Sequence, residues 1–326
     1  MDVRWIGPAG AERYDVTDLP ELRKRTDGVL WVDVPVDDPD AARVLGDVFE
    51  FDTRAVSDSL CRNPSPKLHV YADHVFVILH TPEPGKGGHV HTIELDAFLS
   101  ASMLVTVHGP LNPVLDPGIA LVDTNAVGAR LDAGRWLPDT GYDVLHAIVT
   151  ALNRHMTRHL AQLTSATWDL ERTVTSGHLG NPEEFLEEMF GVSHGLQAVR
   201  TSCALNHEIF ARMAKLGSLG ADGRALVDDA LDQFEHVQVM AQAQKESLLG
   251  VITLYQTRTN TKMTIAAERL AVIAAVTLPV TAVSSIVGMN VIVNDSTHYE
   301  ALAVLLLLMA LMSAWLLYWA KRQGWW

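Results

Sequence analysis

Cysteine and basic residues are both scarce in this sequence. Its 326 residues include two cysteines, Cys61 and Cys203, which lie far apart and lack the spacing of a metal-binding pair. Neither a disulfide framework nor a zinc–thiolate cluster is therefore expected, and the composition fits a reducing compartment. The 39 acidic and 25 basic side chains leave a net charge of −14, so we expect cations as ligands and no nucleic-acid partner.

Signatures of catalysis and of export are also missing. No Ser/His/Asp or Cys/His arrangement with a recognisable context occurs, and the segment Gly85–Gly88 has the character of a hairpin turn without the spacing of a phosphate-binding loop. The chain is therefore not expected to be an enzyme or to hold an organic cofactor. The first residues carry no basic segment followed by an apolar run, so no cleavable signal peptide is expected.

The fourteen histidines do not suggest a zinc site. His155 and His159 are four residues apart in a helical pattern, and His89 and His91 stand beside the expected turn. Zinc sites in proteins have three or four ligands, and no third partner stands near either pair in the sequence. We therefore predict that these histidines are solvated.

Two long runs without charge stand near the C-terminus, Leu270–Val287 and Ala301–Ala320. A helix needs about twenty apolar residues to cross the hydrocarbon core of a bilayer, so each run is long enough to be a membrane span. The first run is rich in Ala, Thr and Ser and contains Pro279, which a span tolerates where it faces other helices or water. A buried helix of a soluble domain is the alternative for the first run. It is disfavoured because the second span needs a partner that returns the chain.

The basic residues near the spans predict their orientation. The joint between the spans, Gly288–Glu300, contains no Lys or Arg. Basic residues instead lie outside both spans, at Arg258, Lys262, Arg269, Lys321 and Arg322. Cytoplasmic flanks of membrane spans carry an excess of Lys and Arg. The sequence therefore predicts a multi-pass protein of the inner or plasma membrane with both termini in the cytoplasm and the lipid bilayer as a partner.

The first 140 residues show short β-type runs separated by turns. Strands are predicted at Val29–Val34, His74–Leu79, Thr92–Leu99 and Met103–Val107, the last two joined as a hairpin, and the Pro82–Gly88 turn cluster is expected to end the second strand. A helical spacing of apolar residues lies between Asp40 and Phe51. The fold class is thus an α+β cytoplasmic domain followed by long helices and two C-terminal transmembrane helices.

Three helical patterns follow this domain. They run from Tyr142 to about Gly177, from Pro182 to about Leu216, and from Arg224 without a break into the first span. The third would be about 96 Å long at 1.5 Å per residue, so it must bundle with copies of itself or with the other two. The predicted domains are 1–140 (cytoplasmic α/β domain), 141–223 (cytoplasmic helical hairpin), 224–267 (stalk helix), 268–290 (first, pore-lining transmembrane helix), 291–300 (extracellular or periplasmic loop), 301–320 (second transmembrane helix) and 321–326 (cytoplasmic tail).

The tripeptide Gly288-Met289-Asn290 ends the first span, ten residues before the second. In this position it resembles the Gly-Met-Asn signature of the CorA family of magnesium and divalent-cation transporters. The segments Leu278–Thr281, Pro66–Tyr71 and Ile93–Leu99 are also similar to that family. The resemblance implies a funnel-shaped homopentamer, with the first span of each subunit lining a pore for Mg²⁺, and with Co²⁺ and Ni²⁺ as further ions.

Some positions depart from the pattern of this family. Val287 stands where the family has a tyrosine, Val291 replaces an aromatic residue, and VIVNDSTHY replaces the Met-Pro-Glu-Leu loop of magnesium members. The alternative hypothesis is therefore a secondary transporter for Zn²⁺ of the same superfamily, coupled to protons. A membrane-tethered sensor or scaffold that does not transport is a third hypothesis, against which the tripeptide at the mouth argues.

The candidate ion-entry site is Gly288, Met289 and Asn290. Mg²⁺ releases its hydration water reluctantly, so a ring of Asn290 carboxamides would offer neutral oxygens to that bound water. Asp295 and Glu300 could form further rings that concentrate cations at the mouth, or could simply keep a short loop hydrated.

One face of the first span carries small and mildly polar residues. Its members are Leu270, Ala274, Thr277, Thr281, Ser284 and Gly288. This stripe suits a pore lining, but close packing between helices uses the same residue types, and both remain open. The family resemblance adds Leu278 to the pore-facing set and makes Leu270 and Leu278 candidate hydrophobic constrictions.

The resemblance also implies gating by cytoplasmic Mg²⁺ held by carboxylates between subunits. Asp228, Asp229 and Asp232, at the start of the long helix, lie where the family places such a group, and Asp229 and Asp232 are the candidate ligands. A bound dication would relieve the repulsion between adjacent carboxylates. Alternatively, acids in the first turns of a helix interact favourably with its dipole.

Overall fold

A computed structural model describes residues 1–177, 181–291 and 299–322. The chain divides into two compact units, Met1–Val251 and Ile252–Trp326. The first unit contains all of the described β-strands together with helices, and the second unit is helical where it is described.

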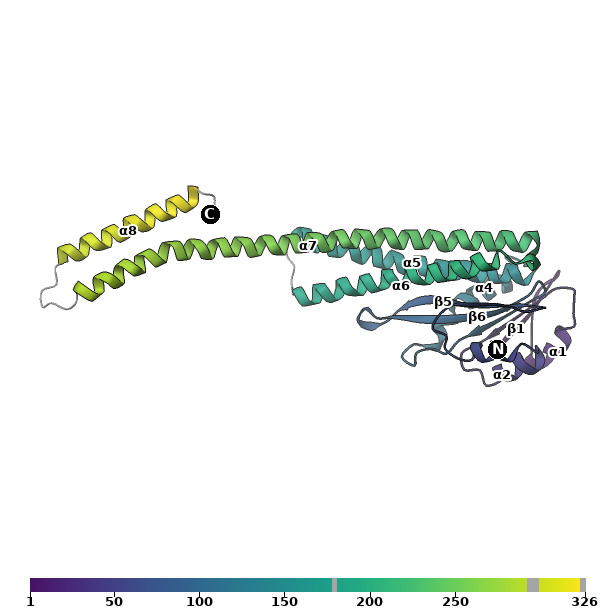
Figure 1. The fold of residues 1–326 in the computed structure, drawn as a ribbon. Helices are drawn as coiled ribbons and strands as arrows, with labels where there is room; N and C mark the ends of the chain where they lie inside the picture. Colours follow the sequence, from purple (N-terminus) through teal and green to yellow (C-terminus); the bar gives the residue numbers. More distant parts are fainter. Residues whose placement is uncertain (178–180, 292–298, 323–326) are drawn as a thin grey trace. The chain divides into compact units, whose positions relative to one another are not determined.

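A seven-stranded sheet is the centre of the first unit (Figure 1). Its strands lie in the order β2 (Gly10–Tyr14), β1 (Asp2–Gly7), β3 (Val29–Val34), β7 (Met103–His108), β6 (Val90–Leu99), β5 (Val75–Pro84) and β4 (Lys67–Val70). The β3–β7 pair is parallel and every other pair is antiparallel. The sheet is therefore mixed, with its single parallel pair near the middle.

Short helices cover one face of this sheet. They are α1 (Leu19–Leu22), α2 (Ala41–Arg43), which continues into a π-helical turn at Val44–Val48, and α3 (Thr53–Ser59). Alternate strand residues face them, as the period of two requires, and the aromatic rings pack together there. Phe51 stacks on Phe98 with ring centroids 4.1 Å apart, and Phe98 in turn contacts Phe76 at 4.6 Å.

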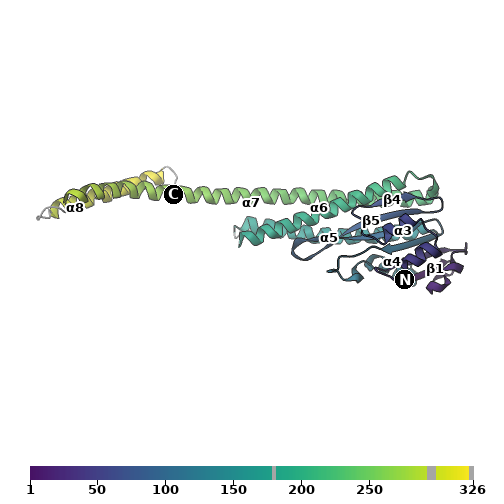
Figure 2. The same ribbon diagram turned by 60° about the horizontal axis from the view of Figure 1, so that its bottom comes forward.

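Long helices cover the other face, as Figures 1 and 2 both show. They are α4 (Val122–Asp132), α5 (Gly141–Ser176) and α6 (Pro182–Met213). Helix α5 begins with a capping box between Thr140 and Asp143. It ends at Gly177, whose φ of 81° is the left-handed conformation that glycine adopts without a Cβ clash.

Helix α7 (Gly220–Val291) begins in the first unit, where it packs on α5 and α6. The ring of Phe234 lies 5.5 Å from that of Phe210 on α6, and Gln233 donates a hydrogen bond of 3.2 Å to the hydroxyl of Thr150 on α5. Its buried apolar residues recur at steps of three, four and seven, which places them along one stripe of the helix. They are Val227, Ala230, Phe234, Val237, Ala241, Leu248 and Val251.

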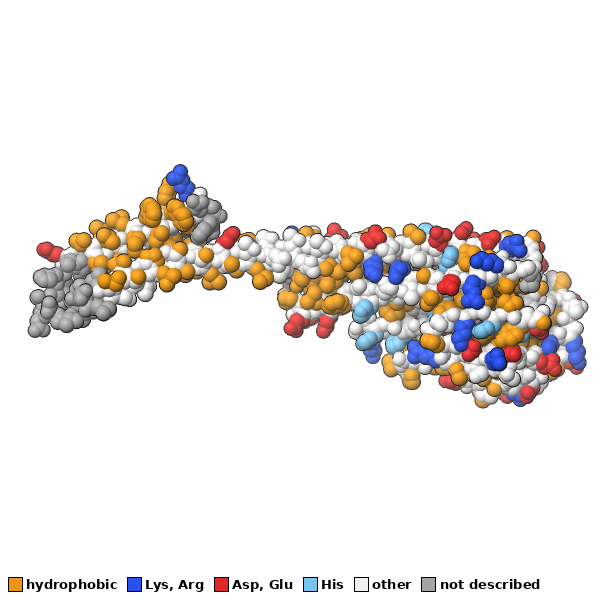
Figure 3. All heavy atoms as spheres, in the orientation of Figure 1, with side chains coloured by type: hydrophobic (Ala, Val, Ile, Leu, Met, Phe, Trp, Pro, Cys, Tyr) orange, Lys and Arg blue, Asp and Glu red, His pale blue; other side chains and the backbone are white. Residues whose placement is uncertain are grey.

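The second unit consists of the later part of α7 and helix α8 (Tyr299–Arg322). Both contain windows apolar enough to cross a membrane, with mean hydropathies of 1.8 and 2.1, and at most 6% of either window is buried. Figure 3 shows hydrophobic side chains gathered over this unit, whereas charged side chains of both signs are spread over the first. A core helix of a soluble protein would bury these side chains.

The predicted fold class is confirmed, and one strand boundary is wrong. Strand β5 continues through the expected turn, with Pro82 opposite Thr92 and Pro84 opposite Val90. Strand β4 pairs with β5 only as far as Ile78, so the later part of β5 has a free edge where a proline loses no ladder hydrogen bond. Strands β1, β2 and β4 are absent from the sequence prediction, in which α7 begins at Arg224, four residues late.

Candidate functional site

The tripeptide Gly288-Met289-Asn290 lies in the last turn of α7, whose helical backbone continues to Val291. Asp295 falls outside the residues that the structure describes. Glu300 is exposed in the first turn of α8, where a negative charge interacts favourably with the helix dipole. The structure thus places the tripeptide at the C-terminal end of an apolar helix.

The small-residue stripe of α7 is exposed within the single chain. Its exposed members are Leu270, Ala274, Thr277, Thr281 and Ser284. The hydroxyl of Thr277 donates to the carbonyl of Ile273 at 2.8 Å, and the hydroxyl of Thr281 donates to the carbonyl of Thr277 at 2.8 Å. Because these hydroxyl protons are already used, each oxygen can act toward its surroundings only as an acceptor. Hydration water on a cation points its hydrogens outward, so such oxygens suit a hydrated cation.

Two leucines on the exposed surface of α7 are large and apolar. Leu270 and Leu278 are each 67% exposed, and both lie in the uncharged run Leu270–Val287. Exposed side chains of this size favour removal from water by about 25 cal/mol for each Å² covered, so lipid or another chain is expected around them. Pro279, beside Leu278, has no N–H to donate to the carbonyl of Ala275.

The candidate regulatory acids differ in their hydrogen-bond partners. The carboxylate of Asp229 lies 2.6 Å from Nε2 of His146 on α5 and accepts a second hydrogen bond of 2.6 Å from Gln233. The hydrogen bond from His146 lowers the pKa of Asp229. Asp228 and Asp232 are exposed. Within the described ranges no group of three or more His, Cys, Asp or Glu side chains is arranged to hold a metal ion, so a metal at these acids needs further ligands.

The prediction that His155 and His159 are solvated is wrong. Nε2 of His155 lies 3.0 Å from the Glu83 carboxylate and Nδ1 lies 3.2 Å from that of Asp123, so its pKa is raised to about 9, chiefly by the hydrogen bond to Asp123 and then by Glu83. His159 is 6% exposed, and burial lowers its pKa. Both residues lie on the face of α5 that turns towards the sheet, which helical periodicity alone could not distinguish from the solvent face.

A buried carboxyl pair on β6 was not anticipated from the sequence. Glu94 accepts hydrogen bonds from the backbone N–H (2.8 Å) and the side-chain amide (2.6 Å) of Asn63. Asp96, on the same face two residues on, is 0% exposed, and burial followed by the charge of Glu94 raises its pKa well above the usual range. The signal that could have revealed the pair is two acids at a spacing of two within the strand sequence IELDAFL.

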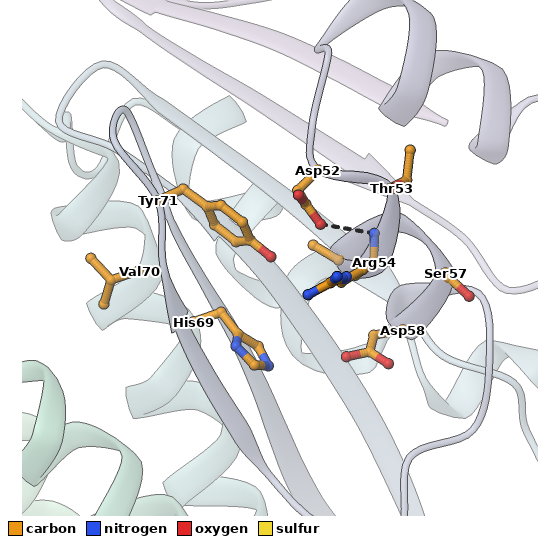
Figure 4. Close-up of a pocket in the computed structure, with 9 residues that line it drawn as sticks. Asp52, Thr53, Arg54, Ser57, Asp58, His69, Val70 and Tyr71 are labelled. Carbon is orange, nitrogen blue, oxygen red and sulfur yellow. Dashed lines mark hydrogen bonds between the residues drawn. The ribbon is translucent and has the colours of Figure 1, made fainter.

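An open, polar pocket lies between α3 and the end of β4 with the residue after it, Tyr71 (Figure 4). Its volume is about 650 Å³, and His69 and Tyr71 face Asp52 and Asp58 across it. The acids already have partners: Asp52 accepts from the backbone N–H of Arg54 at 2.9 Å, and Asp58 pairs with Lys67 at 2.9 Å. This arrangement stabilises the start of α3 and its attachment to β4.

Comparisons with known proteins bear on the whole chain. The model of a family described as CorA-like Mg²⁺ transporter protein matches residues 26–322. The complete structure of the CorA magnesium transporter from Methanocaldococcus jannaschii has a TM-score of 0.80 at 16% identity, over 100% of this chain and 98% of that one. The full-length CmaX protein gives 0.78 at 17% identity with the same coverage.

A third structure matches part of the chain. The cytoplasmic domain of ZntB from Vibrio parahaemolyticus has a TM-score of 0.63 at 11% identity, and the match covers 80% of this chain and 98% of that domain. At these identities the structural likenesses show a shared fold. No curated protein matches the sequence.

Proposed function

The chain belongs to the family of CorA-like Mg²⁺ transporter proteins, and we propose that it is a channel for divalent cations, Mg²⁺ first among them, with Co²⁺ and Ni²⁺ as further ions. The observation that carries the proposal is the end of α7: an apolar, exposed helix with a face of small and mildly polar residues, which ends in Gly288-Met289-Asn290. An anchor for a sensor domain needs neither such a face nor such an end.

In the proposed channel, copies of α7 from a homopentamer surround the ion path. Their exposed small residues line it, and the carboxamides of Asn290 form a ring that binds the water around Mg²⁺. The hydroxyl oxygens of Thr277 and Thr281 support this arrangement, because they are left as acceptors for water on the cation. Asp295 and Glu300 concentrate cations at the mouth.

The proposed gate has a hydrophobic part and a regulatory part. Rings of Leu270 and Leu278 close the path by excluding water. Cytoplasmic Mg²⁺ bound between subunits by Asp229 and Asp232 holds the closed state. The exposure of both leucines and of Asp232 in the single chain supports contacts with neighbouring copies.

The proposed orientation has both termini in the cytoplasm. Arg258, Lys262 and Arg269 precede the apolar window of α7, and Lys321 and Arg322 end α8. Basic residues favour the cytoplasmic side. The joint that holds the tripeptide is therefore on the outer side of the membrane.

A secondary transporter for Zn²⁺, coupled to protons, is the second candidate. It is favoured by the segment after Asn290, which lacks the Met-Pro-Glu-Leu sequence expected of magnesium members. Both candidates use the same architecture and the same entry site, so they differ in the ion carried and in the source of the driving force.

The deciding experiment is flux into liposomes that contain the purified protein, with Mg²⁺ or Zn²⁺ outside and an imposed membrane potential. Asn290→Ala is the test variant, and Asn260→Ala, an exposed asparagine of the same helix, is the matched control. We expect potential-driven Mg²⁺ entry that Asn290→Ala abolishes and Asn260→Ala preserves. Zn²⁺ entry that follows a pH gradient at fixed potential would establish the second candidate. No flux of either ion, with or without Mg²⁺ on the cytoplasmic side, would overturn both.

A further inference from the structure

A groove of about 840 Å³ lies in the first unit between the β5–β6 hairpin and helix α6, with part of α5 as its floor. Figure 1 shows the hairpin running along α6. Leu163 and His159 of α5 form the floor, Phe190 and Val192 of α6 form one wall, and Val90 of the hairpin belongs to the other. This volume and the largely apolar lining are typical of small-molecule sites.

Glycines set the distances across this groove. A Cβ on Gly88, at the tip of the hairpin, would lie 2.7 Å from the Cα of Gly191 on α6, and Gly88 has a φ of 75°. A Cβ on Gly195 would lie 2.7 Å from a methyl group of Leu163. The glycines therefore let the hairpin approach α6 on one side of the groove and let α6 approach α5 on the other. The groove is thus fixed by the packing of these three elements.

The floor contains a polar group without a partner. His159 is 6% exposed, and both of its ring nitrogens are buried without a hydrogen-bond partner among the described residues. Burial lowers the pKa of His159, which favours the neutral ring, and a neutral imidazole presents one nitrogen as an acceptor. An unpaired buried polar group destabilises the folded state unless a ligand or water pairs with it.

The rim has one sign of charge. Glu184, Glu187 and Glu188 line the groove at helical spacings of three and four, and all three are exposed. No Lys or Arg is among the lining residues. The groove therefore favours a cation. It does not favour a bare metal ion, because the described part of the chain contains no convergent set of three metal-ligating side chains.

We propose that this groove binds a small amphipathic amine, with its protonated nitrogen donating to His159 beneath the glutamate rim and its apolar body against Phe190 and Leu163. An ammonium group supplies the donor that the free imidazole nitrogen lacks. The exposed ring of Phe190 offers a face for contact with the apolar body. This site is independent of ion conduction and needs no residue of the entry site.

The test is isothermal titration calorimetry on the full-length protein in detergent micelles. Three probes of similar size differ in the charge of the polar end: 2-phenylethylamine is a cation, 2-phenylethanol is neutral and 3-phenylpropionate is an anion. We expect saturable binding of the amine, at least about tenfold weaker binding of the alcohol, and none of the carboxylate. Partition of the amine into micelles is the same for every variant and cancels in the comparison.

Three variants locate the site. His159→Leu should weaken amine binding at least about tenfold, and Glu187→Gln with Glu188→Gln should weaken it and reduce its salt dependence. Phe190→Ala, at an exposed position, should weaken binding, whereas Trp168→Ala, at a similarly exposed aromatic residue of α5 outside the groove, should not.

Two results would overturn this assignment. Equal affinity for amine and alcohol, or binding unchanged in both His159→Leu and Phe190→Ala, would show that the amine does not occupy this groove. Zn²⁺ binding that is lost in His159→Leu and displaces the amine would show a metal site in its place.

Discussion

Nε2 of His155 lies 3.0 Å from the carboxylate of Glu83, and this contact ties helix α5 to strand β5. The other ring nitrogen lies 3.2 Å from Asp123 of α4. All three side chains are largely buried, at 14–15% exposure. Three elements that are distant in sequence therefore meet at one imidazolium held between two carboxylates.

This triad predicts a pH-dependent stability. The pKa of His155 is raised from 6.5 to about 9, so the protonated ring is the form that the fold stabilises. Its contribution is complete below pH 6.5 and is lost as the pH rises through about 9. We expect His155→Gln to lower the free energy of unfolding by up to about 3 kcal/mol near pH 6 and by much less near pH 10.

Thermal unfolding of the wild type and His155→Gln across this pH range checks the prediction. His207→Gln, in the same helical bundle, is the control for loss of a histidine. Parallel pH curves for wild type and His155→Gln would contradict it, because they would mean that the ring does not change its charge over this range.

The carboxyl of Asp96 also predicts a stability that falls as the pH rises, but for a different physical reason. Burial, and then the charge of Glu94, raise its pKa, so its neutral form is the one that the fold stabilises. Stability from this group is present at low pH and is lost as the pH rises through the raised pKa. Asp96→Asn keeps the shape and cannot ionise, so we expect a higher unfolding midpoint than wild type in alkali and little difference in acid.

Glu94→Gln is the matched comparison for Asp96→Asn. It removes the charged acceptor of two hydrogen bonds from Asn63, so it should destabilise the first unit at neutral pH. An Asp96→Asn protein that is less stable than wild type in alkali would contradict the account.

The hydroxyl of Thr281 is predicted to contact hydrated cations. Thr281→Val keeps the shape and removes the oxygen, and we expect Mg²⁺ flux to fall roughly tenfold, the loss of one polar contact. Thr257→Val is the control, because the hydroxyl of Thr257 likewise donates to the carbonyl four residues before it, that of Thr253, at 2.8 Å, and Thr257 precedes the uncharged run Leu270–Val287. Equal flux in both variants would place Thr281 in a contact between helices.

Leu278 is predicted to restrict the ion path. Leu278→Ala shortens an exposed apolar side chain, which should raise Mg²⁺ leak at high cytoplasmic Mg²⁺ because water enters the constriction more readily. The control is Leu306→Ala, an exposed leucine of α8. A leak that rises equally in both would indicate a general loss of packing.

The carboxylate of Asp229 is predicted to sense cytoplasmic Mg²⁺. Asp229→Asn should keep the hydrogen bond to α5 in part and weaken inhibition of flux by cytoplasmic Mg²⁺. His146→Leu breaks the same contact but leaves the carboxylate. If both variants weaken inhibition equally, Asp229 acts through its attachment to α5 and does not bind the ion.

Several parts of this protein could be predicted because they depend on local sequence. The helical pattern that begins at Pro182 and the uncharged runs at the C-terminus predict the positions of α6, the end of α7 and α8. Strand β2, with its polar sequence GAERY, lies at an edge of the sheet and carries no clear alternation, so it was missed. The proline-containing end of β5 was missed because its free edge is a property of the whole sheet.

The sequence by itself determined the membrane spans, the long helices and the position of the tripeptide, because apolar length and helical period are properties of consecutive residues. Only the tertiary structure decided that His155 is charged between Glu83 and Asp123, that Asp96 is buried, and that His159 faces a groove rimmed by glutamates. Each of these three features depends on which face of α5 or β6 packs against which neighbouring element. Such packing brings together residues that are tens of positions apart in the sequence. Burial and pairing of charge arise from that packing, so a local pattern such as the two acids of IELDAFL marks candidates but does not decide which of them are buried or paired.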